Sequence, residues 1–217
     1  MAITAVVFDV GETLIDESRI WLRWADRLGI PPLTLLSIMG GGGLAAGISI
    51  GQAFDLLRPG IDVEAEEARW AADEPDSLRS GFDADDLYPD VRPALTALHD
   101  AGLRVIIAGN QPAAALAALR AMNLPVDAMK NSAEMGVEKP DPAFFQAVVT
   151  LAGVPAQQIA YVGDRLDNDV LPAASAGMMP VLIRRGPFGY LHALRPEAAR
   201  AAVIDSLNDL PALLGAH

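Results

Sequence analysis

Cysteine is absent from the 217-residue chain, which excludes disulfide bonds and thiolate metal sites. Lysine is scarce, because only Lys130 and Lys139 occur, and the formal net charge is -12. Without a basic stripe, nucleic acid is excluded as the main partner. The apolar runs fall short of the ~20 residues that cross a bilayer, and no signal-peptide pattern opens the chain. We therefore expect a soluble, cytoplasmic protein with no membrane partner.

Short apolar runs rich in β-branched residues alternate with segments of helical periodicity. Strands buried on both faces of a parallel sheet have this pattern. Helices are expected at 91–101, 112–122, 142–152 and 168–176, with glycine just after three of them. The alternation predicts an α/β fold with a doubly wound, mainly parallel, Rossmann-like sheet. The expected strands are TAVVFDV (4–10), LRVIIAG (103–109), IAYVGD (159–164) and PVLIRR (180–185), with VDAMKNS (126–132) and AAVIDSL (201–207) as weaker candidates.

Residues 16–86 interrupt this alternation. Asp16 is expected to cap a helix that ends at Leu28, with Ile20, Trp21, Trp24 and Leu28 on its apolar side. The GGGG run at 40–43 lacks the lysine and Ser/Thr of a P-loop, so we predict a flexible loop there. The simplest organisation is a core domain of residues 1–15 and 87–217 with a small α-helical insertion at 16–86.

Acidic residues follow the ends of two expected strands. Asp9 ends the first strand, and GDRLDND (163–169) supplies Asp164, Asp167 and Asp169. In such sheets ligands bind beyond the carboxyl ends of the strands, so these side chains are expected to meet. Clustered carboxylates repel unless a cation lies among them, and oxygen-only ligands favour Mg²⁺. Lys139 in GVEKPDP (136–142) could hold a second anionic group such as a phosphate.

The segments FDVGETL, VIIAGNQ, GVEKPDP and VGDRLDNDV, in this order, resemble the haloacid dehalogenase-like hydrolases, and the 16–86 insertion falls where that family places a helical cap. The resemblance implies a phosphatase that acts on a small phosphorylated metabolite through an aspartyl-phosphate. It gives Asp9 the role of nucleophile and Lys139 that of neutralising charge beside it. It assigns Mg²⁺ to Asp9, the backbone carbonyl of Gly11, Asp164 and Asp169, and it makes Thr13, Gly109, Asn110 and Lys139 the substrate-binding residues.

Two positions depart from that family's pattern. Gly11 stands where the family's phosphatases carry a second aspartate, the general acid/base, and Gly109 stands where a Ser or Thr binds a phosphate oxygen. General acid–base catalysis contributes about 10²–10⁴ in rate. Three explanations stay open: a substrate with a good leaving group, another acid such as Glu12 or one from the insertion, or a turnover that is slow or lost.

Two further functions remain as alternatives to a phosphatase. A non-catalytic binding protein would explain Gly11 and Gly109. A 2-haloacid dehalogenase also lacks the second aspartate, but the GD…D arrangement of GDRLDND argues against it. We expect Arg165, Arg184 and Arg185 at the surface, and His192 on a helix surface or at a cap. The oligomeric state stays open, with a homodimer as one option.

Overall fold

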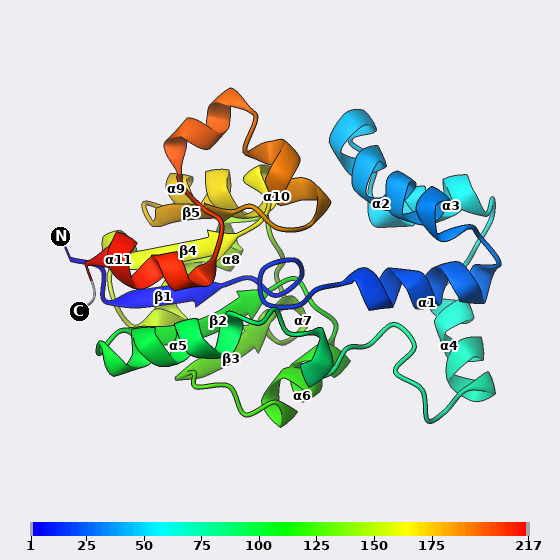
Figure 1. Ribbon diagram of the computed structural model, residues 1–217, viewed down its shortest axis with the longest axis horizontal. Helices are drawn as coiled ribbons and strands as arrows, with labels where there is room; N and C mark the ends of the chain where they lie inside the picture. Colours follow the sequence, from blue (N-terminus) through cyan, green and yellow to red (C-terminus); the bar gives the residue numbers. More distant parts are fainter. Residues whose placement is uncertain (1, 216–217) are drawn as a thin grey trace. The chain divides into compact units, whose positions relative to one another are not determined.

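The computed structural model describes residues 2–215 and divides the chain into two compact units (Figure 1). Residues 1–16 and 87–217 form the larger unit, and residues 17–86 form the smaller. The boundaries expected from the sequence lie within one residue of these. Among the described residues, no helix combines the length and the apolar character needed to span a bilayer.

The larger unit is built on a six-stranded sheet in which all neighbouring strands run parallel (Figure 1). The strand order is β3-β2-β1-β4-β5-β6, so the chain winds outward on both sides of β1 and changes direction between β1 and β4. The predicted doubly wound sheet is confirmed, including both weaker strands. The strands are β1 Ala5–Phe8, β2 Arg104–Gly109, β3 Ala128–Asn131, β4 Ile159–Gly163, β5 Met179–Ile183 and β6 Ala202–Ile204.

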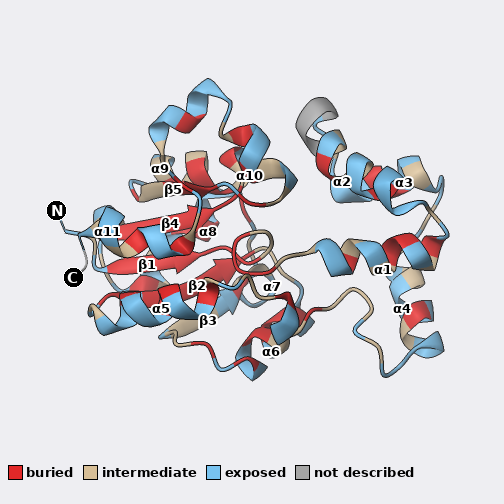
Figure 2. Cartoon of the chain, in the orientation of Figure 1, coloured by how far each residue is buried: buried red, intermediate tan, exposed pale blue. Residues whose placement is uncertain are grey.

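Helices cover both faces of the sheet, so the central strands are fully buried (Figure 2). On one face, Phe145 of α8 (Pro142–Ala152) packs edge-on against Tyr161 of β4, with ring centroids 5.3 Å apart. Burying one large apolar side chain contributes about 1.5–3 kcal/mol. The remaining helices of this unit are α5 Val91–Asp100, α6 Ala113–Ala121, α7 Ser132–Met135, α9 Leu171–Ser175, α10 Gly186–His192 and α11 Leu210–Leu214. Its short helical turns are η2 Ala156–Gln158, η4 Pro196–Arg200 and η5 Leu207–Asp209, and a further turn, η1 Ala84–Asp86, belongs to the smaller unit.

The helix predicted at 168–176 is replaced by two different elements. A single π-helical turn, η3 (Leu166–Val170), comes first, and the short α9 follows it. Periodicity of apolar residues does not separate a π-turn from an α-turn, because both place side chains on one buried face. Such π-turns occur frequently at functional sites.

The smaller unit consists of the helices α1 Ser18–Leu28, α2 Pro32–Ala46, α3 Ile50–Leu57 and α4 Val63–Asp73. Its core is aromatic: the Trp24 ring lies 4.8 Å from that of Phe54 and 5.2 Å from that of Trp70. Arg23 of α1 holds the chain beyond α4, because its guanidinium donates to the carbonyls of Arg79 and Gly81 at 2.6 and 2.5 Å.

Two expectations for this unit are wrong. Glu17, not Asp16, is the residue that precedes the first turn of α1. The glycine run lies within α2 rather than in a loop. Glycine costs about 1 kcal/mol relative to alanine in a helix, but α2 packs against α1 and α3, and Leu35 and Gly40 are buried. Tertiary packing overrides local propensity here.

Candidate active site

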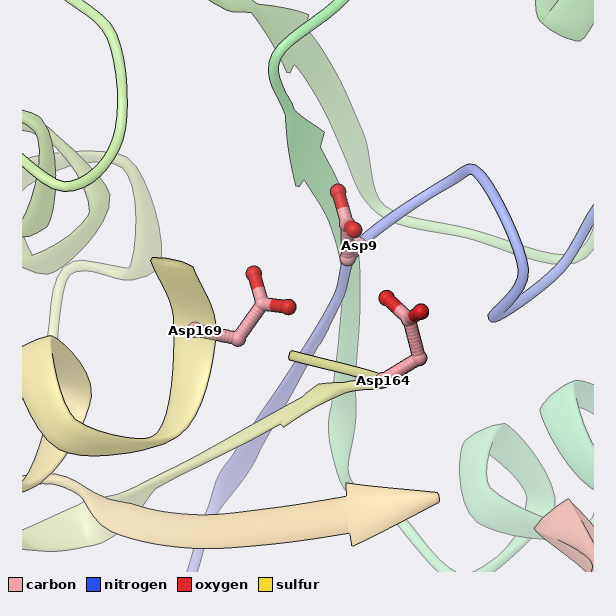
Figure 3. Close-up of side chains that lie close together, drawn as sticks. All are labelled: Asp9, Asp164 and Asp169. Atoms are coloured by element: carbon pink, nitrogen blue, oxygen red, sulfur yellow. The ribbon is translucent and has the colours of Figure 1, made fainter. Parts of the chain in front are cut away.

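Three carboxylates converge at the carboxyl edge of the sheet (Figure 3). Asp9 follows β1 and Asp164 follows β4, the two strands between which the winding changes direction, and Asp169 lies in η3. Each of the three offers a carboxylate oxygen that lies within 4.8 Å of the other two, and all three side chains are buried. The convergence predicted from the strand ends is therefore present.

The chain beyond β4 brings Asp169 back toward Asp164. The backbone N–H of Arg165 donates to Asp169 Oδ2 at 3.0 Å. Gly163 makes room for this return, because a Cβ at that position would lie 2.3 Å from the carboxyl carbon of Asp169. The glycine of the GD pair is thus required by close approach of a side chain. Asp167, by contrast, forms a bidentate pair with the Arg165 guanidinium at the surface.

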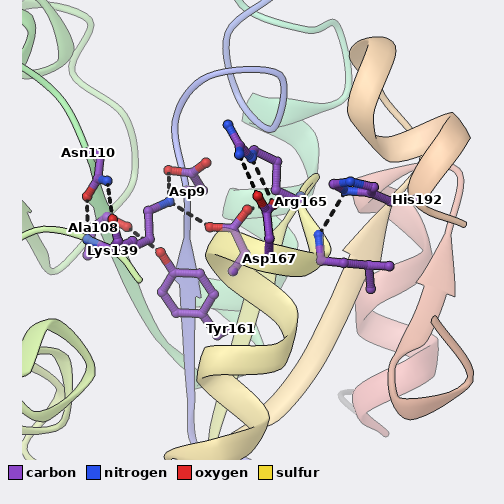
Figure 4. Close-up of polar contacts among 10 residues, drawn as sticks. Asp9, Ala108, Asn110, Lys139, Tyr161, Arg165, Asp167 and His192 are labelled. Carbon is purple, nitrogen blue, oxygen red and sulfur yellow. Dashed lines mark hydrogen bonds and ion pairs between the residues drawn. The ribbon is translucent and has the colours of Figure 1, made fainter. Parts of the chain in front are cut away.

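Lys139 lies among these carboxylates and is 3% exposed. Its Nζ is 2.6 Å from Asp9 Oδ1 and 2.6 Å from Asp169 Oδ1 (Figure 4). The Asn110 side chain fixes the lysine backbone: its Nδ2 donates to Lys139 O at 2.9 Å and its Oδ1 accepts from Lys139 N at 2.8 Å. Both polar atoms of Asn110, predicted to contact substrate, are thus bonded to the lysine.

Burial and charge strongly perturb these groups. Burial alone lowers the pKa of Lys139, but the neighbouring Asp169 and Asp9 carboxylates outweigh it and hold that pKa well above its usual value. Burial, reinforced by the negative charges of Asp169 and Asp9, raises the pKa of Asp164 well above its usual value. Burial also raises the pKa of Asp169 to about 6, against the opposing charge of Lys139.

The donor set suits a hard divalent cation. When all groups are ionised, three carboxylates and one ammonium leave two unbalanced negative charges in a buried site. Oxygen ligands of this kind favour Mg²⁺, and a bound cation would offset the repulsion that raises the carboxyl pKa values. The residues present therefore fit the metal.

Comparison with known proteins agrees with this geometry. Residues 3–177 match the haloacid dehalogenase-like hydrolases. The chain belongs to this family. It is 31% identical to a phosphoglycolate phosphatase of Pseudomonas fluorescens over 94% of this chain and 77% of that protein. A glyceraldehyde 3-phosphate phosphatase of Methanopyrus kandleri is 49% identical over 26% of this chain and 24% of its own length.

A solved structure of the family shares the fold. The HAD hydrolase YfnB of Bacillus subtilis, in a magnesium-bound form, superposes with a TM-score of 0.72 at 16% identity over 99% of both chains. The chain is thus a hydrolase with the HAD core, and phosphatases are among the relatives that match most of its length.

The two glycines that depart from the family's pattern differ in surroundings. At Gly109 a Cβ would lie 2.4 Å from Asp9 Oδ1, so the Asp9 carboxylate occupies the space that a Ser or Thr side chain would need. Gly11 forms an isolated bridge with Ile15 in the turn after β1. Thr13 is fully buried in the same turn, and its hydroxyl has no hydrogen-bond partner among residues 2–215.

Sequence reasoning missed a polar network that holds the turn after β1. Arg185, expected at the surface, is 7% exposed and donates to Thr13 O at 2.6 Å while pairing with Asp90. Its guanidinium lies 4.3 Å from the Tyr88 ring centroid. Tyr88 donates to Glu12 Oε2 at 2.6 Å, which commits that carboxylate to a structural bond. In the structure Ile183 and Arg185 are buried and Arg184 between them is exposed, but nothing in the sequence distinguishes the two arginines.

Proposed function

We propose that the protein is a Mg²⁺-dependent phosphatase that cleaves a small phosphorylated metabolite through an aspartyl-phosphate on Asp9. The observation that carries the proposal is Lys139 Nζ bridging Asp9 and Asp169 at 2.6 Å each, beside the Asp164 carboxylate. A nucleophile, a fixed positive charge and a cation-binding set of oxygens are the parts that phosphoryl transfer requires.

Asp9, Asp164 and Asp169, with the Gly11 carbonyl, would hold Mg²⁺, which would shield the negative charge of the phosphoryl oxygens. Lys139 binds Oδ1 of Asp9, so we assign the attack on phosphorus to Oδ2. The Oδ2–P bond forms as the bond between phosphorus and the leaving oxygen breaks, and water then hydrolyses the aspartyl-phosphate. Asn110 contributes by fixing the Lys139 backbone.

Protonation of the leaving oxygen lacks its usual donor. Gly11 offers no acid, and Glu12 is engaged by the Tyr88 hydroxyl. We therefore infer a substrate with a weakly basic leaving group, such as an acyl phosphate, or an acid from residues 17–86. The named substrates of the relatives make phosphoglycolate and glyceraldehyde 3-phosphate the first compounds to assay.

The dehalogenase alternative is not favoured. A phosphoglycolate phosphatase is 31% identical over 94% of the chain, whereas solved dehalogenases that cover 97–100% of it are 23–25% identical. A dehalogenase would also not need the Asp164–Asp169 pair. A binding protein without turnover remains the second candidate, and Gly11 and Gly109 are its support. A cap role for residues 17–86, a cytoplasmic location and a homodimer remain predictions.

Trapping with beryllium fluoride tests the proposal. Beryllium fluoride and Mg²⁺ are expected to form a phosphate-like adduct on Asp9, detected by ¹⁹F NMR, and Asp9→Asn is the matched control. A panel of phosphorylated metabolites and 2-halo acids, assayed with and without Mg²⁺, then separates the functions. An adduct without hydrolysis of any phosphate favours the binding protein, and halide release without Mg²⁺ refutes the phosphatase.

A further inference from the structure

The loop that carries Asp164 and Asp169 is held by hydrogen bonds from two consecutive backbone N–H groups (Figure 4). The N–H of Arg165 donates to Asp169 within the loop. The N–H of Leu166 donates instead to Nδ1 of His192, at 3.0 Å, across 26 residues of sequence. An imidazole from a separate helix therefore holds the backbone between the two acids.

His192 is the last residue of α10 and is 2% exposed, so of the two positions expected from the sequence, a helix surface or a cap, the exposed surface is wrong. Phe188, one turn earlier, lies against the same loop: its ring centroid is 4.4 Å from the Arg165 guanidinium carbon and 5.6 Å from the His192 ring. The helix thus contacts two successive loop residues, the side chain of Arg165 and the backbone of Leu166.

We propose that His192 is a positioning residue that fixes the spacing of Asp164 and Asp169, and so sets the affinity of the site for a divalent cation. This inference rests on the proposed metal site. An N–H donor requires an unprotonated Nδ1, so the neutral ring carries its proton on Nε2. A buried N–H that loses its acceptor is costly, and the loop would rearrange to recover a partner, separating the two carboxylates.

The surroundings of His192 keep the ring neutral. Burial lowers the pKa of His192, with the positive charges of Arg195 and Arg165 acting in the same direction and Asp167 opposing them. Groups that orient metal ligands from outside the ligand set change metal affinity by about 10- to 100-fold when they are mutated. An effect of this size is expected here.

The amide pair His192→Asn and His192→Gln tests the inference. The Oδ1 of asparagine is as many bonds from the backbone as the Nδ1 of histidine, so it can accept the hydrogen bond from the Leu166 N–H. The Oε1 of glutamine lies one methylene further from the backbone. His99→Gln, at an exposed position of α5, is the matched control. Calorimetric titration with Mg²⁺ alone should show a weakening of about 10- to 100-fold for His192→Gln, with His192→Asn and His99→Gln close to wild type.

A second measurement needs no variant. Long-range ¹H–¹⁵N spectra of the wild-type protein should show His192 protonated on Nε2 only. Proton occupancy of Nδ1, or equal Mg²⁺ affinity of the two amide variants and the wild type, overturns the positioning role while leaving the proposed function intact. Failure of the wild type to bind Mg²⁺ overturns both.

Discussion

Replacing Lys139 by methionine tests whether this one cation stabilises the buried acids. The side chain is 3% exposed and contacts two carboxylates at 2.6 Å. At that separation and an effective dielectric constant of about 20, each pair interacts by about 6 kcal/mol. Removing the lysine also removes its own desolvation cost, so the net loss is smaller. For a buried pair that loses one partner it is about 3–5 kcal/mol.

Urea unfolding of the variant, with and without Mg²⁺, measures this loss. The free energy of unfolding of a domain is about 5–15 kcal/mol, so the variant should fold but unfold at lower urea. Mg²⁺ should recover part of the loss, because the cation supplies positive charge to the same oxygens. Lys130→Met is the matched control, since the only other lysine is exposed on β3. Coincident unfolding curves for both variants would refute the electrostatic account of this site.

Three further outcomes are expected. Gly11→Asp should raise phosphatase activity by about 10²-fold or more, and more for an alkyl than for an aryl phosphate, because the more basic alkoxide needs the proton more; no gain in a folded, Mg²⁺-binding variant contradicts the missing-acid explanation. Gly109→Ala should cut the rate about tenfold or more, because the added Cβ would displace Asp9 at an overpacking cost of about 1–3 kcal/mol, whereas Gly51→Ala, whose Cβ meets nothing closer than 3.9 Å, should not. Without metal, the folded protein binds a proton at Asp169 more tightly than the unfolded chain does, because the pKa of Asp169 is raised to about 6. This proton contributes stability at low pH, and the contribution is lost as the pH rises from about 4 through 6. The Mg²⁺-induced rise in Tm should therefore be larger at pH 7.5 than at pH 5, and Asp169→Asn should reduce the difference.

Much of the fold follows from local pattern. Short β-branched runs predict the strands because a strand buried on both faces has no polar side to show. Their alternation with helices predicts the parallel sheet, and parallel strands end at one edge, so Asp9, Asn110 and Asp164 could be placed together from sequence order. Repulsion among the clustered acids of GDRLDND and Asp9 pointed to a cation, whereas the role of the lysine in GVEKPDP came from the resemblance to the HAD-like hydrolases.

Tertiary structure decided what sequence periodicity does not encode. Arg185 and His192 belong to a segment with ordinary surface composition, and only the packing of β5 and α10 beside the sheet edge buries them and supplies Thr13 O and Leu166 N as partners. Gly109 looks like a lost hydroxyl in the sequence, whereas the structure shows the Asp9 carboxylate in that space. The glycine run is helical because α1 and α3 pack beside it. In each case the deciding contact joins residues far apart in the chain or overrides a local preference, and such contacts exist only once the chain has folded.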